Sequence, residues 1–372
     1  MPAKNHAAYH LKWPQVSAFR LKRHHLADPL PADLDTVCRD VCGIQCQVMA
    51  AAELALWARN HRLTRRDIQA AIWEVRSLIK TALMRGTLHL ISSADFPLYI
   101  SALRPSRVQE TLRIMARYGV TPKEAFAVKD AVVETLGAGP LTRRELTERV
   151  LALNIVGTKA RLWYEQSAWG VARLPIVEGF VCYGPDRARE VTFTRVDQWL
   201  PKQKEIPERE ARKILLRRYL AAYGPATPLD FSHWTGFRMD EVTDIWESLG
   251  EELVEASVGD FRGAIHRQDC RQLVKHPPGE PILRLLPGFD PYMLSHAKKS
   301  YLVDSRWYKR VYRPQWWISP VVLLNGRVVG TWSYTRRGKK PSLTIKLFEK
   351  LPRMLRDRID EEAASVESFL AG

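Results

Sequence analysis

The sequence predicts an α+β protein in which three tandem winged-helix domains (helix-turn-helix plus β-hairpin wing) precede a C-terminal β-barrel-like domain with a terminal helix. Two observations predict this fold class. Three successive segments each follow the order helix, short turn, helix, β-hairpin, and beyond Pro281 the pattern changes to short apolar strands. A chain of 372 residues is long enough for several domains.

The first winged helix is predicted over residues 15–120. Thr64 and Asp67 have the spacing of a capping box and mark a helix start. The alternating run LIKTALMRGTLHLI, broken at Arg85 and Gly86, predicts a β-hairpin. Helices are expected over 33–41, 45–59 and 67–75.

The second winged helix is predicted over residues 121–205. Its first helix is expected over 123–136. Thr142, with Glu145 three residues later, predicts the N-cap of the next helix. The hairpin is expected over 174–193, with turn signals at Glu178–Gly179 and Gly184–Pro185.

The third winged helix is predicted over residues 206–275. The run ELVEASVGDFRGAIHR predicts its hairpin, with Gly259 and Asp260 at the tip. Its helices are expected over 208–222, 229–234 and 240–249.

The C-terminal β-barrel-like domain is predicted over residues 281–372, after a polar linker at 275–281 that contains three prolines. Asn325–Gly326 between apolar alternations is a strong hairpin signal. A final helix over 351–369 is expected to close this domain. Its strands are expected in ILRLLP, YLVD, WISPVVLLNGRVVGTWSY and LTIKLF.

The charge balance indicates a polyanionic partner. The chain has 57 Lys plus Arg against 41 Asp plus Glu, a net charge of +16, and nucleic acid is the commonest partner for such an excess. Simple solubility is the alternative interpretation. Eleven basic residues and one acid lie in 296–340, interleaved with aromatic residues, and ten basic residues and four acids lie in 61–117. Cations that hold phosphates and aromatic rings that stack on bases suit nucleic acid, although some of the aromatics must form β-sheet core.

Other classes of protein lack their sequence signals. The chain has no apolar run of about 18 residues and no apolar signal-peptide region, so we expect a cytoplasmic protein with no membrane partner. Cys38, Cys42 and Cys46 lie four apart, and we interpret them as buried structural cysteines rather than metal ligands. HExxH, GxxxxGK[ST] and GxSxG are all missing. We expect no metal and no cofactor.

Gln45 and Gln47 flank Cys46 where a helix is expected to begin after Gly43. Near a frayed helix start, both side chains can point outward and place two carboxamides on one concave surface. The alternative is that both are ordinary polar helix residues.

Four segments together resemble the winged-helix DNA glycosylase family of the AlkZ type, known for azinomycin resistance and interstrand-crosslink repair. The resemblance extends from about Phe19 to Tyr334 and implies a C-shaped channel for duplex DNA. Members of the family, which occurs in many bacteria, excise N-alkylated purines, including bulky N7 adducts, and some unhook interstrand crosslinks. The segments are GIQCQVMAAAELALWAR, AIWEVRSLIKTALMRGTLHLISSADFP, LLPGFDPYMLSHAKKSYLVD and NGRVVGTW.

The family's catalytic motif, Gln-Φ-Gln, falls on Gln45 and Gln47, with Cys46 as a Φ residue smaller than usual. Alkylation at N7 makes the purine a cationic leaving group, so the enzyme mainly has to position water and stabilise an oxocarbenium-like sugar. The resemblance therefore implies a monofunctional DNA glycosylase in which Gln45 and Gln47 hold the attacking water, with no covalent intermediate and no strand cleavage.

The expected partner is double-stranded DNA that contains alkylated bases, bound by a monomeric, nucleoid-associated enzyme of base excision repair. Arg85 at the first hairpin turn is interpreted as a phosphate contact; a solvated arginine is the alternative. Full base flipping is not assumed, because bulky adducts do not suit a tight pocket. The other DNA-contact candidates are Arg76, Lys80, His296, Lys298, Lys299, Arg336, Arg337, Lys339 and Lys340.

The main rival hypothesis is a non-catalytic winged-helix protein, either a transcriptional regulator or a resistance protein that binds an adduct without cleaving it. Three unequal winged helices in one chain have no need of the dimeric half-site arrangement that regulators use. Tight binding to alkylated DNA without base release would identify the adduct-binding protein.

Overall fold

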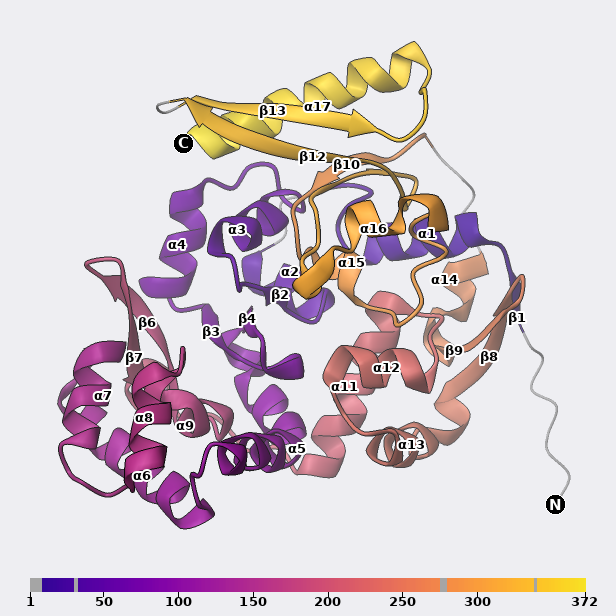
Figure 1. Ribbon diagram of the computed structural model, residues 1–372. Helices are drawn as coiled ribbons and strands as arrows, with labels where there is room; N and C mark the ends of the chain where they lie inside the picture. Colours follow the sequence, from indigo (N-terminus) through magenta and orange to yellow (C-terminus); the bar gives the residue numbers. More distant parts are fainter. Residues whose placement is uncertain (1–8, 30–32, 275–279, 338–339) are drawn as a thin grey trace, which may run out of the picture. The chain divides into compact units, whose positions relative to one another are not determined.

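The computed structural model describes residues 9–29, 33–274, 280–337 and 340–372 (Figure 1). It has a mixed α+β composition, as predicted. The chain divides into two compact units: unit 1 contains residues 1–69 and 216–372, and unit 2 contains residues 70–215. The predicted division into four domains is finer than these units and stays a prediction, and most of the predicted linker lies outside the described residues.

Unit 2 begins within α4 (Arg65–Trp73) and ends within α11 (Glu208–Tyr223). The hairpin predicted for the first winged helix is confirmed, because β3 and β4 pair antiparallel from Leu78↔Ser92 to Ala82↔Leu88. The strands are β3 (Leu78–Ala82), β4 (Leu88–Ser92), β5 (Leu141–Thr142), β6 (Val181–Arg187) and β7 (Glu190–Arg195). The helices are α5 (Phe96–Arg117), α6 (Pro122–Thr135), α7 (Arg143–Leu151), α8 (Thr158–Gln166), α9 (Arg173–Val177) and α10 (Val196–Trp199).

The second half of unit 2 has the order α6, β5, α7, α8, α9, β6, β7, with a three-stranded sheet β5-β7-β6. The Thr142 hydroxyl accepts from the Glu145 N–H at 3.2 Å, so the predicted N-cap is confirmed. The predicted hairpin was wrong in its start and turn. Residues 173–177 are helical instead. The pairing of β6 with β7 shifts register between Gly184 and Arg187, so β6 continues beyond Gly184. The turn therefore lies at Ala188–Arg189, where both residues have positive φ.

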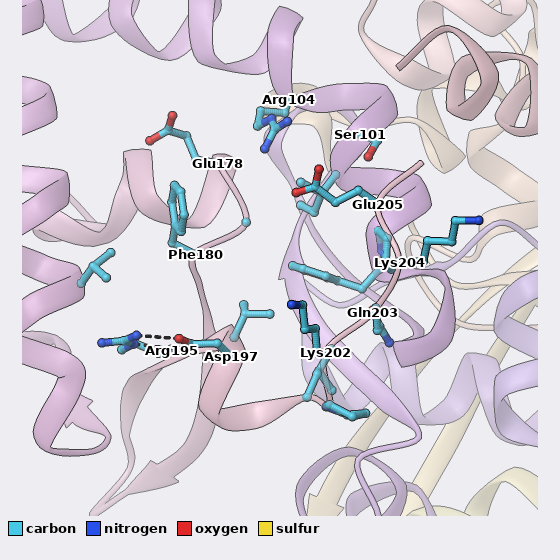
Figure 2. Close-up of a pocket in the computed structure, with 18 residues that line it drawn as sticks. Ser101, Arg104, Glu178, Phe180, Arg195, Asp197, Lys202, Gln203, Lys204 and Glu205 are labelled. Carbon is cyan, nitrogen blue, oxygen red and sulfur yellow. Dashed lines mark hydrogen bonds and ion pairs between the residues drawn. The ribbon is translucent and has the colours of Figure 1, made fainter. Parts of the chain in front are cut away.

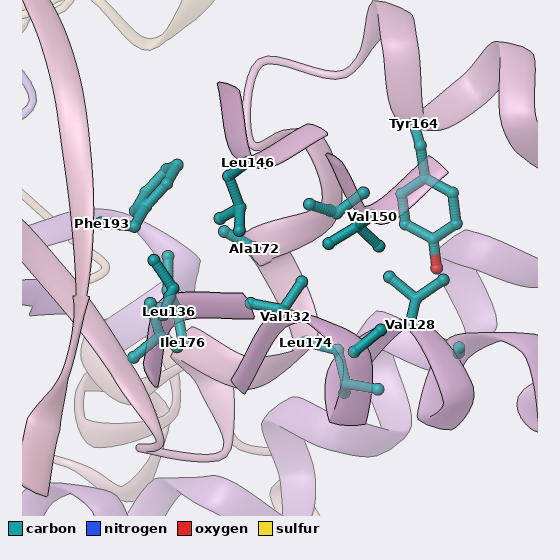
Figure 3. Close-up of a cluster of buried hydrophobic side chains, with 14 of the residues drawn as sticks. Val128, Val132, Leu136, Leu146, Val150, Tyr164, Ala172, Leu174, Ile176 and Phe193 are labelled. Atoms are coloured by element: carbon teal, nitrogen blue, oxygen red, sulfur yellow. The ribbon is translucent and has the colours of Figure 1, made fainter. Parts of the chain in front are cut away.

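An apolar core holds these elements together (Figure 3). Leu136, Leu146 and Val150 are fully buried, and Phe193 of β7 is 1% exposed. On α7, Leu146 and Val150 lie four residues apart and therefore on one face of the helix. The helix that the Thr142 N-cap predicted therefore turns one apolar face to this core.

Unit 1 combines N-terminal and C-terminal segments. Its helices are α1 (Trp13–Arg23), α2 (Leu34–Asp40), α3 (Met49–Trp57), α12 (Pro228–Thr235), α13 (Met239–Glu247), α14 (Cys270–Val274), α15 (Pro291–Leu294), α16 (Tyr308–Val311) and α17 (Arg353–Ala371). Its strands are β1 (Tyr9–Leu11), β2 (Ile44–Gln45), β8 (Leu253–Val258), β9 (Phe261–His266), β10 (Leu283–Leu286), β11 (Val321–Leu324), β12 (Arg327–Arg337) and β13 (Lys340–Leu347).

The third predicted hairpin is confirmed as β8–β9, which closes at Val258↔Phe261. Two pairings were not predicted from the sequence. The N-terminal strand β1 joins β8 in parallel, and Ala226, between α11 and α12, forms an isolated bridge with Ala264 of β9. Both pairings join residues that are distant in the sequence, so no local pattern in the sequence predicts either of them.

The C-terminal segment forms an antiparallel sheet with the order β10-β11-β12-β13, covered by α17 (Figure 1). The predicted Asn325–Gly326 turn is confirmed, and both residues have positive φ. The Glu367 carboxylate on α17 accepts from the N–H of Leu343 on the edge strand β13 at 2.7 Å. The predicted strand at 301–304 was wrong: this segment is a turn whose apolar residues are buried, which an apolar run alone cannot distinguish from a strand.

A fully buried ion pair lies in the interior of unit 1. Nη1 and Nη2 of Arg59, just after α3, each donate to one oxygen of Asp290 at 2.8 Å, and both side chains are 0% exposed. Asp290 also accepts from the N–H of Tyr292 and so caps α15. The pair joins parts of the chain that are 231 residues apart. None of the helices in the described residues is long and apolar enough to cross a membrane.

Asp290→Ala should destabilise the protein by about 3–5 kcal/mol, because it leaves the buried Arg59 charge without its partner. Urea unfolding measures this loss. The double variant Arg59→Met plus Asp290→Leu should lose less, since no unpaired charge remains. An equal loss in both variants would show that packing rather than charge pairing matters at this position.

Three buried histidines predict acid sensitivity. Burial is the largest cause that lowers the pKa of His24 and His296, and it lowers that of His89 to about 3. The unfolded chain therefore binds more protons below about pH 6.5, and the free energy of unfolding should fall there by about 1.4 kcal/mol per pH unit for each histidine. Above that pH their contribution is constant. Unfolding midpoints in urea that do not change between pH 7.5 and 5.5 would contradict this prediction.

Candidate active site

The Gln45–Cys46–Gln47 segment is not helical. The predicted helix over 45–59 was wrong at its start, since β2 ends at Gln45, Gln47 lies in a bend, and α3 begins at Met49. Gln45 is 8% exposed, Cys46 is 1% exposed, and Gln47 is exposed. Of the two glutamines, Gln47 is therefore the one that the segment presents to solvent.

A tight turn directs the chain into this segment. Helix α2 ends at Asp40, and Cys42 and Gly43 follow with φ of 59° and 93°. The Gly43 N–H donates to the carbonyl of Cys38 at 2.7 Å, which closes the helix end. The buried Tyr223 hydroxyl donates to the carbonyl of Val41 at 2.7 Å and fixes the turn to α11.

The other side of the segment is anchored through α3. Beyond its C-terminus, Arg59 makes the buried ion pair with Asp290. Earlier in the helix, the buried Glu53 accepts from Arg65 Nε at 2.9 Å and from Gln69, which ties α4 to α3. The glutamine segment is thus held on both sides by buried polar contacts.

In unit 2, Arg85 occupies the β3–β4 turn with φ of 54° and is partly exposed. The next residue, Gly86, has φ of 70°, and a Cβ there would lie 1.9 Å from Nη2 of Arg107. Arg107 is buried and pairs with Glu110. Burial lowers the pKa of the adjacent His89 to about 3, with Arg85 the next cause, so its ring adds no charge at neutral pH. Arg85 is therefore the charged group that this turn presents.

The other two candidates of unit 2 pack against aromatic rings. The guanidinium of Arg76 lies 3.9 Å from the ring centre of Trp199 and donates to its carbonyl at 3.3 Å. The Lys80 ammonium lies 5.2 Å from the ring centre of Tyr183, and Lys80 is only 9% exposed. These contacts stabilise unit 2 and leave little of Lys80 for a ligand.

In unit 1, His296 and Lys299 are buried, at 1% and 7% exposure. The His296 ring is within hydrogen-bond distance of Arg20 Nη2, at 3.0 Å, and of the Ser295 hydroxyl, at 2.7 Å. Their expected place on a DNA-contact surface does not fit this burial, and we treat both as structural residues. Lys298 between them is exposed.

The β12–β13 hairpin presents Arg336 and Lys340, which are both exposed. Nη2 of Arg336 donates to the carbonyl of Leu370 at 2.9 Å, so α17 supports this end of the hairpin. Arg337 ends β12. Lys339 lies outside the described residues.

Sequence reasoning missed two arginines beside a cavity of about 680 Å³ in unit 1. Arg62 and Arg66 line it from the turn before α4 and from α4 itself, and Ser365 and Ser368 line it from α17. Both arginines are exposed. The basic run at 61–117 was the available signal, but it did not single out these positions.

A second cavity, of about 810 Å³, lies in unit 2 (Figure 2). It carries charges of both signs: Arg104, Lys202 and Lys204 against Glu178 and Glu205. Burial raises the pKa of Glu178. This mixture of charges and an apolar wall does not indicate a phosphate site.

The cysteines are buried, as predicted. Cys38 and Cys42 are 0% exposed and Cys46 is 1% exposed. They do not share one helical stripe, because α2 ends before Cys42. Within the described ranges, no group of three His, Cys, Asp or Glu residues is arranged to hold a metal ion.

Comparisons with known proteins agree with the predicted resemblance. A family model described as "DNA glycosylase AlkZ-like" matches residues 38–369. The chain is 31% identical over 369 residues to the interstrand DNA cross-link repair glycosylase of Streptomyces sahachiroi, with 95% of each chain covered. It also matches the solved structure of Streptomyces sahachiroi DNA glycosylase AlkZ, with a TM-score of 0.86 and 30% identity over 98% of this chain and 97% of that one.

Fold and similarity together define the class of protein, a DNA glycosylase, which is a hydrolase that acts on N-glycosyl bonds. Within this class, the chain belongs to the AlkZ-like family.

Gly86→Ala should both destabilise the protein and weaken DNA binding, because the new Cβ displaces the buried guanidinium of Arg107, which packs against the turn that carries Arg85 and pairs with Glu110. Gly259→Ala is the matched control: Gly259 also has positive φ, 58° against 70°, but no atom lies within 4 Å of its Cβ position. The control should lose only the conformational part, about 1 kcal/mol. Urea unfolding and duplex-DNA titration check this. Equal effects of the two substitutions would show that the contact with Arg107 is unimportant.

Proposed function

We propose that this protein is a monofunctional DNA glycosylase that hydrolyses the N-glycosidic bond of N7-alkylated purines, with Gln45 and Gln47 positioning the attacking water. The observation that carries the proposal is the placement of the Gln45–Cys46–Gln47 segment. It is not helical, it presents Gln47 to solvent beside the buried Gln45, and buried contacts through Tyr223 and Arg59 anchor the chain before and after it. A held segment of this kind costs little reorganisation when the reaction occurs.

The chemistry needs little from the protein beyond position. Water attacks C1′ of the deoxyribose, the bond from C1′ to the purine nitrogen breaks, and the purine leaves with the bonding electrons. An N7-alkylated purine is cationic, so it departs as a neutral base. Carboxamide oxygens accept hydrogen bonds from the water and orient it, and the proton that the water loses passes to solvent. Because a carboxamide is a poor base, undamaged DNA should react slowly.

The related Streptomyces sahachiroi enzyme is named for the repair of interstrand crosslinks. We extend this substrate to the present chain, because a site formed on a short non-helical segment with Gln47 exposed does not require a closed pocket around the base. Bulky N7 adducts and crosslinks are then substrates of the same reaction.

The proposed architecture is the one expected from the sequence, three winged helices and a barrel-like C-terminal domain. Three observations support it. A hairpin follows the helices in each predicted copy. A short strand precedes the next helix in the second copy, and the bridge at Ala226 has the same place in the third. Threonine capping boxes open α4, α7 and α12.

The proposed DNA contacts are the exposed basic groups, Arg85 in unit 2 and Arg62, Arg66, Lys298, Arg336 and Lys340 in unit 1. Each such contact releases counterions when it neutralises a phosphate, so binding should weaken as salt rises. We propose a monomer that acts on duplex DNA in the cytoplasm.

The double substitution Gln45→Ala plus Gln47→Ala should lower the rate of base release from duplex DNA that contains N7-methylguanine by about 100-fold or more. The reason is that the attacking water is no longer held. Single-turnover base release measures this rate. The matched control is Gln109→Ala on the exposed face of α5, which should release base at the wild-type rate.

DNA affinity of the double variant should stay within about threefold of wild type, because no cation is removed. Base release by wild type and double variant at the same rate would overturn the role of the two glutamines. Tight binding of adducted DNA without base release by wild type would instead identify a non-catalytic, adduct-binding protein.

A further inference from the structure

Trp316 is the most exposed of the large apolar side chains that the structure describes, at 89% exposure. It lies at the tip of a turn between α16 and β11, in the one-turn 3₁₀ segment Pro314–Trp316. An indole left in water forgoes the free energy of burial that the other tryptophans of a fold gain. Its exposure therefore calls for a ligand that covers it.

The backbone under Trp316 is strained. Gln315 and Trp316 have φ of 59° and 61°, so two consecutive residues with side chains occupy the left-handed region that favours glycine. Such conformations persist where surrounding structure enforces them, and they concentrate at functional sites.

The surrounding structure does enforce this turn. The Arg313 N–H donates to the carbonyl of Trp317 at 2.8 Å, and Tyr312 forms a β-bridge with Ile318. One step further out, the Ser319 N–H donates to the carbonyl of Val311 at 2.9 Å. The turn is thus a small closed hairpin with Trp316 at its tip.

Contacts on both sides of Trp316 hold the turn in place. The Trp317 ring, although 47% exposed, meets Phe289 edge-on with ring centres 5.1 Å apart, and Ile318 is 5% exposed. The Tyr312 hydroxyl donates to the carbonyl of Met293 at 2.8 Å. The turn is therefore supported from below, and Trp316 is its most exposed ring.

The chemistry around the tip is cationic. Lys309, Arg310 and Arg313 are exposed, and none of them forms an ion pair with an acid among the described residues. The nearby Arg306, by contrast, is neutralised by Asp304 and Glu349. Arg310 also lies 4.6 Å from the ring centre of Trp307. An exposed aromatic ring on a basic segment matches a base and its phosphates, which is the arrangement that binds unstacked nucleic acid.

We propose that Trp316 stacks on a DNA base at the damaged position, with Lys309, Arg310 and Arg313 holding the adjacent phosphates. The proposal rests on the proposed function only in taking duplex DNA as the ligand. Trp316 acts as a wedge that occupies the space left where a base is missing or displaced, and its strained turn keeps the ring in place before DNA arrives.

The test uses a duplex with a tetrahydrofuran abasic site and 2-aminopurine beside it. No base can be released from this site, so the outcome does not depend on the role of Gln45 and Gln47. Wild-type protein should lower the 2-aminopurine fluorescence on binding, because a stacked aromatic ring quenches it, and Trp316→Ala should lose that fall and bind about tenfold more weakly. Trp316→Phe should retain most of both effects. Met354→Ala, which removes another exposed apolar side chain, at 64% exposure, is the matched control and should behave as wild type.

The salt dependence of DNA affinity distinguishes the contribution of stacking from that of phosphate contacts. Trp316→Ala should leave the slope of log affinity against log salt unchanged, whereas Arg313→Ala should reduce it by about 0.9. Trp316→Gly should be at least as stable as wild type, because glycine relieves the left-handed strain, yet it should bind DNA as weakly as Trp316→Ala.

Unchanged DNA affinity and fluorescence in Trp316→Ala would overturn the proposal and leave the ring as a contact for another protein. Loss of stability in Trp316→Gly would also overturn it, because the side chain would then be a structural one.

Discussion

The bidentate ion pair between Arg59 and Asp290 is the interaction on which the organisation of unit 1 depends. It closes a chain separation of 231 residues with two charge-assisted hydrogen bonds between fully buried side chains. A buried charge tolerates no loss of its partner, so the N-terminal and C-terminal segments must assemble together. Because Arg59 follows α3, the same pair fixes the helix that begins just after the glutamine segment. The ion pair that joins the two ends of unit 1 therefore also positions the helix next to the candidate site.

The site and the proposed wedge follow the same physical design. In each, hydrogen bonds on both sides hold a short non-helical segment, and at least one polar or aromatic side chain of that segment is exposed. Gln47 is exposed beside the buried Gln45 between the Tyr223 contact and the Arg59 pair, and Trp316 projects from the hairpin closed by Tyr312 and Ile318. Rigid support matters for mild chemistry. Carboxamides supply neither a strong base nor a nucleophile, so rate must come from position, and position requires groups that do not have to reorganise.

Much of the fold could be predicted from local patterns. Helices α7, α11 and α12 and the hairpins at Arg85–Gly86, Gly259–Asp260 and Asn325–Gly326 were predicted closely, because capping, apolar spacing and turn residues act within a few positions. The errors have a common cause. The segment at 45–48 has helix-forming neighbours but is a strand end followed by a bend, and the run at 301–304 has a strand-like composition but is a turn. In both places, contacts with distant residues override the local preference.

The sequence by itself determined the class of the protein, the positions of most elements, and the two glutamines that resemble a catalytic motif. It also showed the basic, aromatic-rich segment that contains Trp316. Only the tertiary structure decided which members of that segment face solvent. His296 and Lys299 are interior, whereas Lys298 and Trp316 are exposed. The physical reason is that charge and composition are sums over the chain. Burial depends instead on which distant side chains pack against each position. No local pattern in a single sequence identifies those packing partners.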